Sequence, residues 1–262
     1  MRLIHISDLH FGTEIPELVA SLRAHIKATP ADMVIVSGDM TQVASHDEFT
    51  RAQDFLHSLG MPLFCIPGNH DIPRFNFWQR LTDPLGRYQR YFGAELTPVW
   101  QQGPVCIAGI NTARPILPHW NWAHGAVSAQ QLKQLARIYD NAHDRVRVCV
   151  MHHPLQTTMD HHFKNIVYGR ARAIDALARM RVDLVLTGHV HHAAATFMDF
   201  EDHRTVFLGA STALSRRIRR SANGYNVIDI DAAEINMHIY SFQQQKFDLL
   251  ETITHPLHRA SL

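Results

Sequence analysis

Five short polar motifs follow predicted β-strands, and their side chains are of the kinds that bind metal ions. The motifs are Asp8-Leu9-His10, Gly38-Asp39, Gly68-Asn69-His70-Asp71, His152-His153 and Gly188-His189-Val190-His191. Together they offer carboxylate, amide and imidazole groups and no thiolate. Oxygen and nitrogen donors of this kind suit manganese, iron(II) or zinc, and they argue against copper(I) or an iron–sulfur cluster. The motifs therefore predict a transition-metal site.

The strength of this prediction comes from the motifs taken together. Histidine makes up 20 of the 262 residues, so a single histidine motif carries little weight. A lone histidine is more often a hydrogen-bonded or surface group than a ligand. The tetrad Gly68 to Asp71 is more specific, because it arises by chance roughly twice in a thousand sequences of this composition. Its occurrence at a strand end, together with four similar motifs, favours one common site.

An α/β fold would bring these strand ends together. Apolar runs at residues 3–6, 33–36 and 63–66 predict buried strands, and helical spacing within 18–26 and 49–59 predicts helices between them. Strand, helix and strand at this spacing imply parallel pairing in a layered fold. Ligands in open α/β sheets bind at the carboxyl ends of the strands, where these motifs lie.

The second half of the chain repeats this pattern and then changes. Apolar runs predict strands at 105–110, 146–151 and 184–186, and a capping box at Ser128 and Gln131 predicts the start of a helix. A further helix is predicted around Ile174 to Ala178. The last sixty residues predict strands without helices, at 205–208, 225–230, 235–242 and 247–253. We expect these last strands to pair antiparallel in a second sheet. We expect the chain 1–262 to be one domain.

Two segments, 72–101 and 114–125, fit the alternating pattern poorly. Aromatic side chains are frequent in 72–101 and in 114–125, including Trp78, Trp100 and Trp122. One interpretation is an aromatic-rich cap over the site. The other is the packing of an irregular surface lobe, and the sequence leaves both open.

Composition narrows the classes of partner. The net charge is +1, so the chain has no broad basic field, and long nucleic acid is not an expected substrate. The sequence contains no run of 18 apolar residues, so no membrane span is predicted. Cys65, Cys106 and Cys149 are scattered within apolar runs and are expected to be free thiols. The start of the chain lacks the apolar core of a signal peptide, so we expect a cytoplasmic protein.

The order of the five motifs, from Asp8 to His191, resembles that of the calcineurin-like metallophosphoesterase family. The resemblance implies a four-layer α/β/β/α sandwich, in which helices flank two mixed β-sheets and a dimetal site lies at the strand carboxyl ends. It implies two divalent ions, which could be manganese, iron or zinc. One ion would be held by Asp8, His10, Asp39 and His191, and the other by Asp39, Asn69, His152 and His189, with Asp39 as the bridge.

The resemblance also implies a reaction. Two cations joined by a carboxylate share a hydroxide, which attacks the phosphorus of a phosphodiester in line with the leaving group. Asp39 is thus a catalytic residue as well as a ligand. Asn69 and His70 are expected to contact the substrate, and His70 would stabilise the phosphoryl charge or protonate the leaving oxygen.

Several neighbouring residues receive a weaker interpretation. Asp71 either orients a histidine or caps its turn. His153 and His192 are expected not to be ligands, because adjacent side chains of a strand point to opposite sides. The remaining loop histidines (His119, His124, His161 and His162) could line the mouth of a pocket, and the arginine run 216–220 could bind phosphate. The favoured interpretation of both is a solvated surface.

Departures from the family's patterns favour one branch. Met40 to Val43 follow Gly38-Asp39, which differs from protein Ser/Thr phosphatases, and Gln42 stands where purple acid phosphatases have a ligand tyrosine. The chain most resembles compact bacterial cyclic-nucleotide and glycerophosphodiester phosphodiesterases, which implies 3′,5′-cyclic AMP as a first substrate and a homodimer as one arrangement. The alternatives are another diester (a glycerophosphodiester, a nucleotide-lipid headgroup or a short nucleic acid) and a non-catalytic interaction protein on the same fold.

Overall fold

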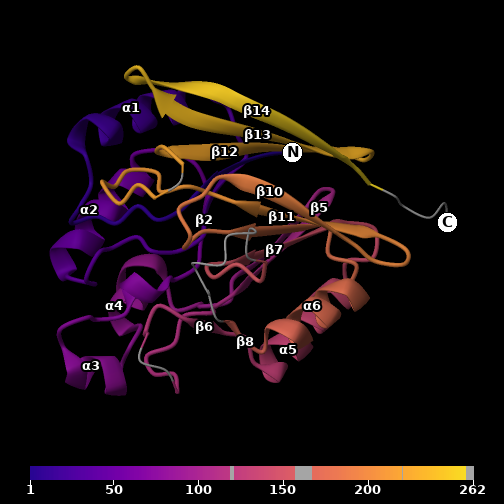
Figure 1. The fold of residues 1–262 in the computed structure, drawn as a ribbon, viewed down its shortest axis with the longest axis horizontal. Coiled ribbons are helices and arrows are strands. Elements are labelled where there is room, and N and C mark those ends of the chain that lie inside the picture. The colour runs from indigo at the N-terminus through magenta and orange to yellow at the C-terminus, as the bar shows by residue number, and fades with distance from the viewer. Residues whose placement is uncertain (119–120, 157–166, 220, 258–262) are drawn as a thin grey trace.

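The structure is a computed structural model that describes residues 1–118, 121–156, 167–219 and 221–257. Two six-stranded sheets lie face to face, and helices cover their outer faces (Figure 1). In Figure 1 the strands β12, β13 and β14 run along the top of the molecule, and β5, β7, β10 and β11 run below them. This is the predicted α/β/β/α arrangement, with mixed sheets.

The first sheet contains three parallel strands and three antiparallel ones. Its order is β14 (Lys246–Pro256), β13 (Glu234–Gln243), β12 (Gly224–Ile230), β1 (Arg2–Ile6), β2 (Met33–Val36) and β3 (Leu63–Cys65). The parallel strands β1, β2 and β3 are connected by α1 (Pro16–Lys27) and α2 (His46–His57). Leu18, Leu22 and Ile26 form the buried stripe of α1, as their spacing predicts.

The second sheet has a parallel centre with an antiparallel strand at each edge. Its order is β10 (Ala194–Asp199), β11 (Arg204–Gly209), β9 (Leu184–Thr187), β7 (Val146–Met151), β5 (Val105–Ile110) and β4 (Val99–Gln102). The helices α5 (Ala129–Asp140) and α6 (Arg170–Arg179) pack on its outer face, and Ser128 and Gln131 form the predicted capping box of α5.

Three buried clusters hold the layers together. Residues of both sheets, such as Leu3, Ile35, Val148 and Leu186, form the cluster between the sheets. A second cluster lies under α1 and α2, and a third lies under α5 and α6. Apolar burial is the dominant favourable contribution to such packing. The site at the strand ends is therefore supported by a core on every side of each sheet.

The prediction that the last strands of the chain pair antiparallel in a second sheet is wrong in two respects. The strands β12, β13 and β14 extend the first sheet, because β12 pairs antiparallel with the free edge of β1. Residues 205–208 lie in β11, which pairs parallel with β9 in the second sheet. Hydrophobic patterning predicts each strand but not its partner, since pairing depends on contacts between segments distant in the sequence.

Residues 72–125 divide into core and surface parts, and a cap over the site stays a prediction. Trp100 lies in β4, and Tyr88 of α4 (Gly86–Phe92) is fully buried against the first sheet. Exposed aromatic side chains remain near the short helix α3 (Phe77–Thr82), and a two-stranded sheet joins β6 (Gly125–Ala126) to β8 (Val167–Tyr168). Among the described residues, no helix is long and apolar enough to cross a bilayer. That the chain forms one domain stays a prediction.

Candidate metal centre

All seven predicted ligands lie near one another at the carboxyl ends of β1, β2, β3, β7 and β9. Potential ligand atoms within 4.8 Å of one another form four overlapping groups: Asp8, His10 and His191; His10, Asp39 and His70; Asp8, Asp39 and His152; and His152, His153 and His189. The seventh residue, Asn69, adjoins them through Oδ1, 3.2 Å from His152 Nε2. The site receives Asp8, His10, Asp39 and Asn69 from the first sheet, and His152, His189 and His191 from the second.

The backbone bends sharply at these positions. Asp8, His10, Asp39, His189 and His191 have positive φ angles of 52°, 46°, 54°, 69° and 52°. They make up five of the nine non-glycine residues in this conformation within the described chain. Positive φ is uncommon for residues other than glycine, and such strain concentrates at functional sites. These bends turn the side chains into a shared space immediately after each strand.

Two motif glycines allow the loops to approach closely. A Cβ atom at Gly68 would overlap the Asp39 carboxylate, and one at Gly188 would overlap the side chains of Ser7 and Asp8. Glycine is therefore required at both positions by the space available. This explains physically why these motifs contain Gly before the chemical residues.

The first cluster brings two imidazole nitrogens and a carboxylate oxygen together. His10 Nδ1 lies 3.3 Å from the Thr41 carbonyl oxygen, and His191 Nδ1 lies 2.5 Å from that of Arg217. Because a carbonyl oxygen only accepts, each Nδ1 carries a proton, and Nε2 is the nitrogen that each ring turns toward the cluster. The two Nε2 atoms are 3.2 Å apart, and His191 Nε2 is 3.0 Å from Asp8 Oδ1.

A bound cation would stabilise this arrangement of donor atoms. Asp8 Oδ1 is buried and has no hydrogen-bond partner, although two imidazole nitrogens converge on it. Burial lowers the pKa of His10 to about 4, although the Asp8 carboxylate opposes this, so the ring stays neutral. Burial also raises the pKa of Asp8, but His191 and His10 more than offset it and hold the pKa well below its usual range. A carboxylate and two neutral imidazoles fit a divalent transition-metal ion.

The second cluster has the same design around His152. Its Nδ1–H donates to the Ser37 carbonyl oxygen at 2.7 Å, and its Nε2 lies 3.2 Å from both Asp39 Oδ2 and Asn69 Oδ1. Burial lowers the pKa of His152, but the Asp39 carboxylate raises it to a net value of about 9. A proton on Nε2 thus lies where the carboxylate, amide and imidazole would meet a cation.

Asp39 belongs to both clusters. Its Oδ2 lies 3.2 Å from His152 Nε2 and 3.7 Å from His10 Nε2, while Oδ1 accepts the His70 backbone N–H at 2.8 Å. The carboxylate is buried and fixed by the loop after β3. It is thus positioned to contact ions at both clusters.

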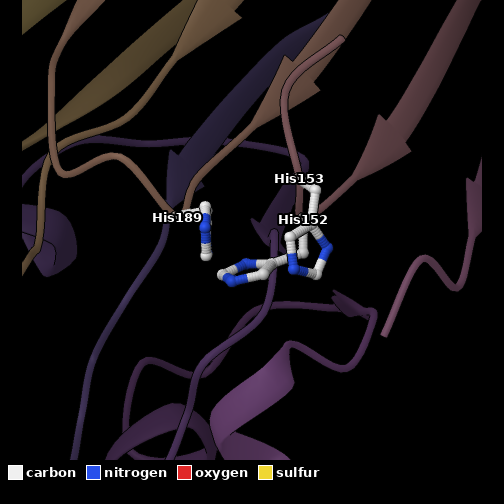
Figure 2. Close-up of side chains that lie close together, drawn as sticks. All are labelled: His152, His153 and His189. Carbon is white, nitrogen blue, oxygen red and sulfur yellow. The ribbon is translucent and has the colours of Figure 1, made fainter. Parts of the chain in front are cut away.

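His153 lies closer to the site than its sequence position predicts. Figure 2 shows the rings of His152, His153 and His189 gathered together, with His153 centred 4.9 Å from His152 and 4.5 Å from His189. The expected alternation of sides is wrong here, because the chain leaves the extended conformation after Met151. His153 Nε2–H donates to the Ala123 carbonyl oxygen and Nδ1 accepts from Thr112 Oγ1, so both ring nitrogens are engaged. These bonds favour a non-ligand role.

The loop after β3 forms a single turn of 3-10 helix, η1 (Asn69–Asp71), which Asp71 fixes in place. Its carboxylate accepts hydrogen bonds from the Gly68 and Thr41 backbone N–H groups and from the Thr41 hydroxyl. No contact with a histidine is recorded for this carboxylate within the described residues. The geometry favours the turn-capping interpretation of Asp71.

His70 stands between the clusters and an open pocket. Its Nδ1–H donates to the Gln42 carbonyl oxygen at 2.7 Å, and its Nε2 accepts from Arg217 Nη1 at 2.9 Å. Its ring packs edge-on against His10, with centroids 4.8 Å apart. The pocket has a volume of about 300 Å³ and includes Asn69, His70, Trp122 and Arg217 in its lining.

Arg217 and His124 are less exposed to solvent than the sequence predicts. Arg217 is half-buried, so the solvated interpretation of the arginine run is wrong there, whereas Arg216 and Arg219 are exposed. His124 is buried rather than solvated. His119, His161 and His162 lie outside the described residues. Arg217 had no distinguishing signal in the sequence beyond its place in the arginine run.

Comparisons with known proteins agree with this geometry. Residues 1–193 match the family described as Calcineurin-like phosphoesterase. The chain is 26% identical over 212 residues to the probable glycerophosphodiester phosphodiesterase GpdQ of Arcobacter nitrofigilis, covering 75% of this chain and 74% of that protein. It is 24% identical over 218 residues to the 3′,5′-cyclic adenosine monophosphate phosphodiesterase CpdA of Haemophilus influenzae, covering 73% and 70%.

A solved structure shares the fold. The dimetal phosphatase LOC 393393 of Danio rerio superposes with a TM-score of 0.68 at 13% identity, over 97% of this chain and 98% of that one. At this identity the likeness supports the fold alone. The match over residues 1–193 identifies the family, and the chain belongs to the calcineurin-like phosphoesterases as a metal-dependent phosphoester hydrolase.

Proposed function

We propose that the protein is a binuclear metal-dependent phosphodiesterase that hydrolyses small phosphodiesters, with 3′,5′-cyclic AMP as the first candidate. The observation that carries this proposal is the convergence of imidazole Nε2 atoms and carboxylate oxygens in two clusters that share Asp39. Such a donor set binds a pair of transition-metal ions. Manganese, iron and zinc are the candidate ions.

The proposed ligands follow the two clusters. Asp8, His10, Asp39 and His191 would hold one ion, and Asp39, Asn69, His152 and His189 would hold the other. The backbone carbonyls of Thr41, Ser37 and Arg217 accept from Nδ1–H of the ligand histidines, which fixes the Nε2 atoms toward the ions. Hydrogen bonds of this kind orient metal-binding imidazoles.

The catalytic contribution of the chain centres on His70 and Asn69. Bound divalent cations would activate water as the nucleophile and neutralise charge on the phosphate. The bond from Nδ1–H to Gln42 fixes the His70 ring, so Nε2 is the atom that faces the pocket. In the imidazolium form, with Nε2 protonated and the bond from Arg217 released, His70 could donate a proton or a hydrogen bond at that atom to a phosphate or leaving oxygen. Asn69 adjoins it and can orient the same phosphate through its amide group.

Two observations bear on the substrate. A pocket of about 300 Å³ suits a small diester better than a long polymer. The ring of Trp122 lines this pocket, and the guanidinium of Arg80, which lines it too, lies over the ring at 4.5 Å from its centroid. An indole held in this way can stack on a purine, which favours a cyclic nucleotide.

A glycerophosphodiester is the second candidate, and the similarity to the Arcobacter protein favours it. Other diesters, such as a nucleotide-lipid headgroup or a short nucleic acid, share the same reacting group. A non-catalytic interaction protein on this fold has no need of the unpartnered Asp8 oxygen or of the strained ligand backbone, so we place it last. A cytoplasmic location and a homodimer stay predictions.

The test is a substrate screen with manganese-loaded protein. Cyclic AMP, a glycerophosphodiester, a bis-aryl phosphodiester and a phosphomonoester are compared, with the His70→Ala variant as the blank. Metal analysis should find up to two ions per chain, and a chelator should abolish diester hydrolysis. Activity that survives complete metal removal, or hydrolysis confined to the monoester, would overturn the proposal.

A further inference from the structure

The described residues 210–219 and 221–223, between β11 and β12, form one wall of the site. Thr212 Oγ1 donates to the Asp8 carbonyl oxygen at 2.7 Å. Asn223 Nδ2 donates to the Ser215 carbonyl oxygen at 2.9 Å, and the Arg217 N–H donates to Ser215 Oγ at 3.1 Å. Thr212, Ser215 and Asn223 are buried. A buried hydrogen-bond network therefore fixes the backbone of Arg217, and this backbone in turn positions the base of the side chain.

One nitrogen of the Arg217 guanidinium is held by hydrogen bonds within the protein, and the other two are available to bind a ligand. Nη1 donates to Gln42 Oε1 at 3.0 Å and to His70 Nε2 at 2.9 Å. Within the described residues, Nε and Nη2 have no hydrogen-bond partner and no carboxylate lies within 4 Å. Those two atoms form the flat edge with which arginine binds a phosphate or carboxylate through two parallel hydrogen bonds.

This arginine differs from the other arginines that form ion pairs. Arg2, Arg51, Arg181 and Arg204 pair with carboxylates near the surface. Arg217 is half-buried and lines the pocket beside His70 without such a partner. A positive charge taken partly out of water is costly unless an anion compensates it. The neighbouring pocket is where an anionic substrate would supply that compensation.

We propose that Arg217 is a substrate-binding residue, whose Nε and Nη2 atoms bind non-bridging oxygens of the phosphate beside His70. This inference rests on the proposed function, because the bound group is the scissile phosphodiester. Arg217 lies outside the five motifs, and it contributes a fixed positive charge that the ligand residues do not provide. Its bond to His70 Nε2 also keeps that ring facing the pocket.

The backbone carbonyl of Arg217 has a role separate from that of the side chain, so an experiment can distinguish the two contributions. Its carbonyl oxygen accepts from His191 Nδ1–H and so orients a proposed metal ligand. A side-chain substitution leaves this carbonyl in place. We therefore expect variants at this position to keep their metal while they lose affinity for phosphate.

The experiment compares Arg217→Ala and Arg217→Lys with a matched control, Arg216→Ala, because Arg216 is exposed in the same run. Each manganese-loaded protein is measured for metal content, for affinity to inorganic phosphate by calorimetry, and for KM and kcat with the diester that the wild type hydrolyses best. Melting temperatures check that each variant is folded.

Arg217→Ala should bind phosphate about tenfold more weakly and lose about ten- to a hundredfold in kcat/KM, mainly through KM, at unchanged manganese content. Arg217→Lys should recover part of the loss, because it restores the charge but not the flat edge. Arg216→Ala should stay within about twofold of the wild type, because its exposed side chain is already solvated.

Two results would overturn the inference: Arg217→Ala with wild-type phosphate affinity and kcat/KM, or Arg217→Ala with a matching loss of manganese, which would indicate a structural role. If the wild type binds manganese but hydrolyses no diester, the proposed function fails. The phosphate affinities of the same variants still decide whether Arg217 is an anion site.

Discussion

The metal-facing cluster and the pocket beside it are built on different principles. The cluster residues follow strands of the two sheets, and most of them are buried and strained. The pocket is lined by irregular segments, including the loop of Arg217 and the turn that carries Trp122, which is 46% exposed. In the proposed function, the sheets would fix the reaction chemistry, and loops that can vary independently would recognise the substrate.

The largest effect should come from the residue shared by both clusters. Asp39→Ala removes a carboxylate next to His152 and His10, so manganese content should fall at both positions and kcat by roughly a thousandfold. Metal analysis after dialysis and initial rates measure this. Asp248→Ala, which removes a half-buried carboxylate on β14 that pairs with Lys246 and lies outside the site, is the control. A variant that keeps one ion at full occupancy would contradict the bridging role.

His70→Ala separates the two regions, because His70 lies at their boundary. The ring is held by Gln42 and Arg217 rather than by a carboxylate, so the variant should keep its manganese and lose about a hundred- to a thousandfold in kcat. His57→Ala, at an exposed histidine at the end of α2, should match the wild type. Loss of an ion in His70→Ala would place His70 among the ligands instead.

Trp122→Ala tests the recognition role of the pocket. If the indole stacks on a purine, KM for cyclic AMP should rise about tenfold, while KM for a glycerophosphodiester should change little. Trp78→Ala is a matched control, since that ring is 76% exposed and does not line the pocket. An equal loss with both substrates would argue against stacking.

The smallest effect concerns a histidine that is buried near the cluster but does not face it. His5 Nε2 donates to Ser37 Oγ and its Nδ1 accepts from Asn226 Nδ2, so both nitrogens have partners. Burial lowers the pKa of His5 to about 3, so the folded protein keeps it neutral. The unfolded chain binds a proton below about pH 6.5, and the stability that His5 contributes is therefore lost as the pH falls through that value.

The wild type should lose about 1 kcal/mol of unfolding free energy between pH 8 and pH 6 from this residue alone. His5→Gln should show a shallower decline, measured by urea unfolding with a chelator present in both proteins. Parallel slopes for the two proteins would show that His5 does not carry the effect. The comparison then separates histidines that are buried for packing from those buried for metal binding.

The sequence predicts the cluster better than the pocket. The motif residues Asp8 to His191 are brought together as expected, because parallel strands place their carboxyl ends at one sheet edge. Local signals also predicted the α5 capping box and the buried stripe of α1. Each of these depends on residues close in the chain or on a general rule of sheet topology.

The features that sequence reasoning missed depend on long-range packing. The pairing of β12 with β1 joins residues more than 200 positions apart, and no local pattern encodes it. Arg217 could not be distinguished from Arg216 or Arg219, since only the fold of the described residues between β11 and β12 turns one of these arginines inward. The approach of His153 to His189 depends on a bend after β7 that breaks the strand's alternation.

The division of ligands between the two sheets has a mechanical consequence. Asp8 and His10 belong to one sheet and His191 to the other, and Asp39 and His152 are divided in the same way. An ion in either cluster would therefore crosslink the two halves of the molecule across their shared hydrophobic interface. Sliding of one sheet against the other would stretch both coordination spheres at once, so metal loading should slow amide exchange deep in the sandwich, far from the pocket.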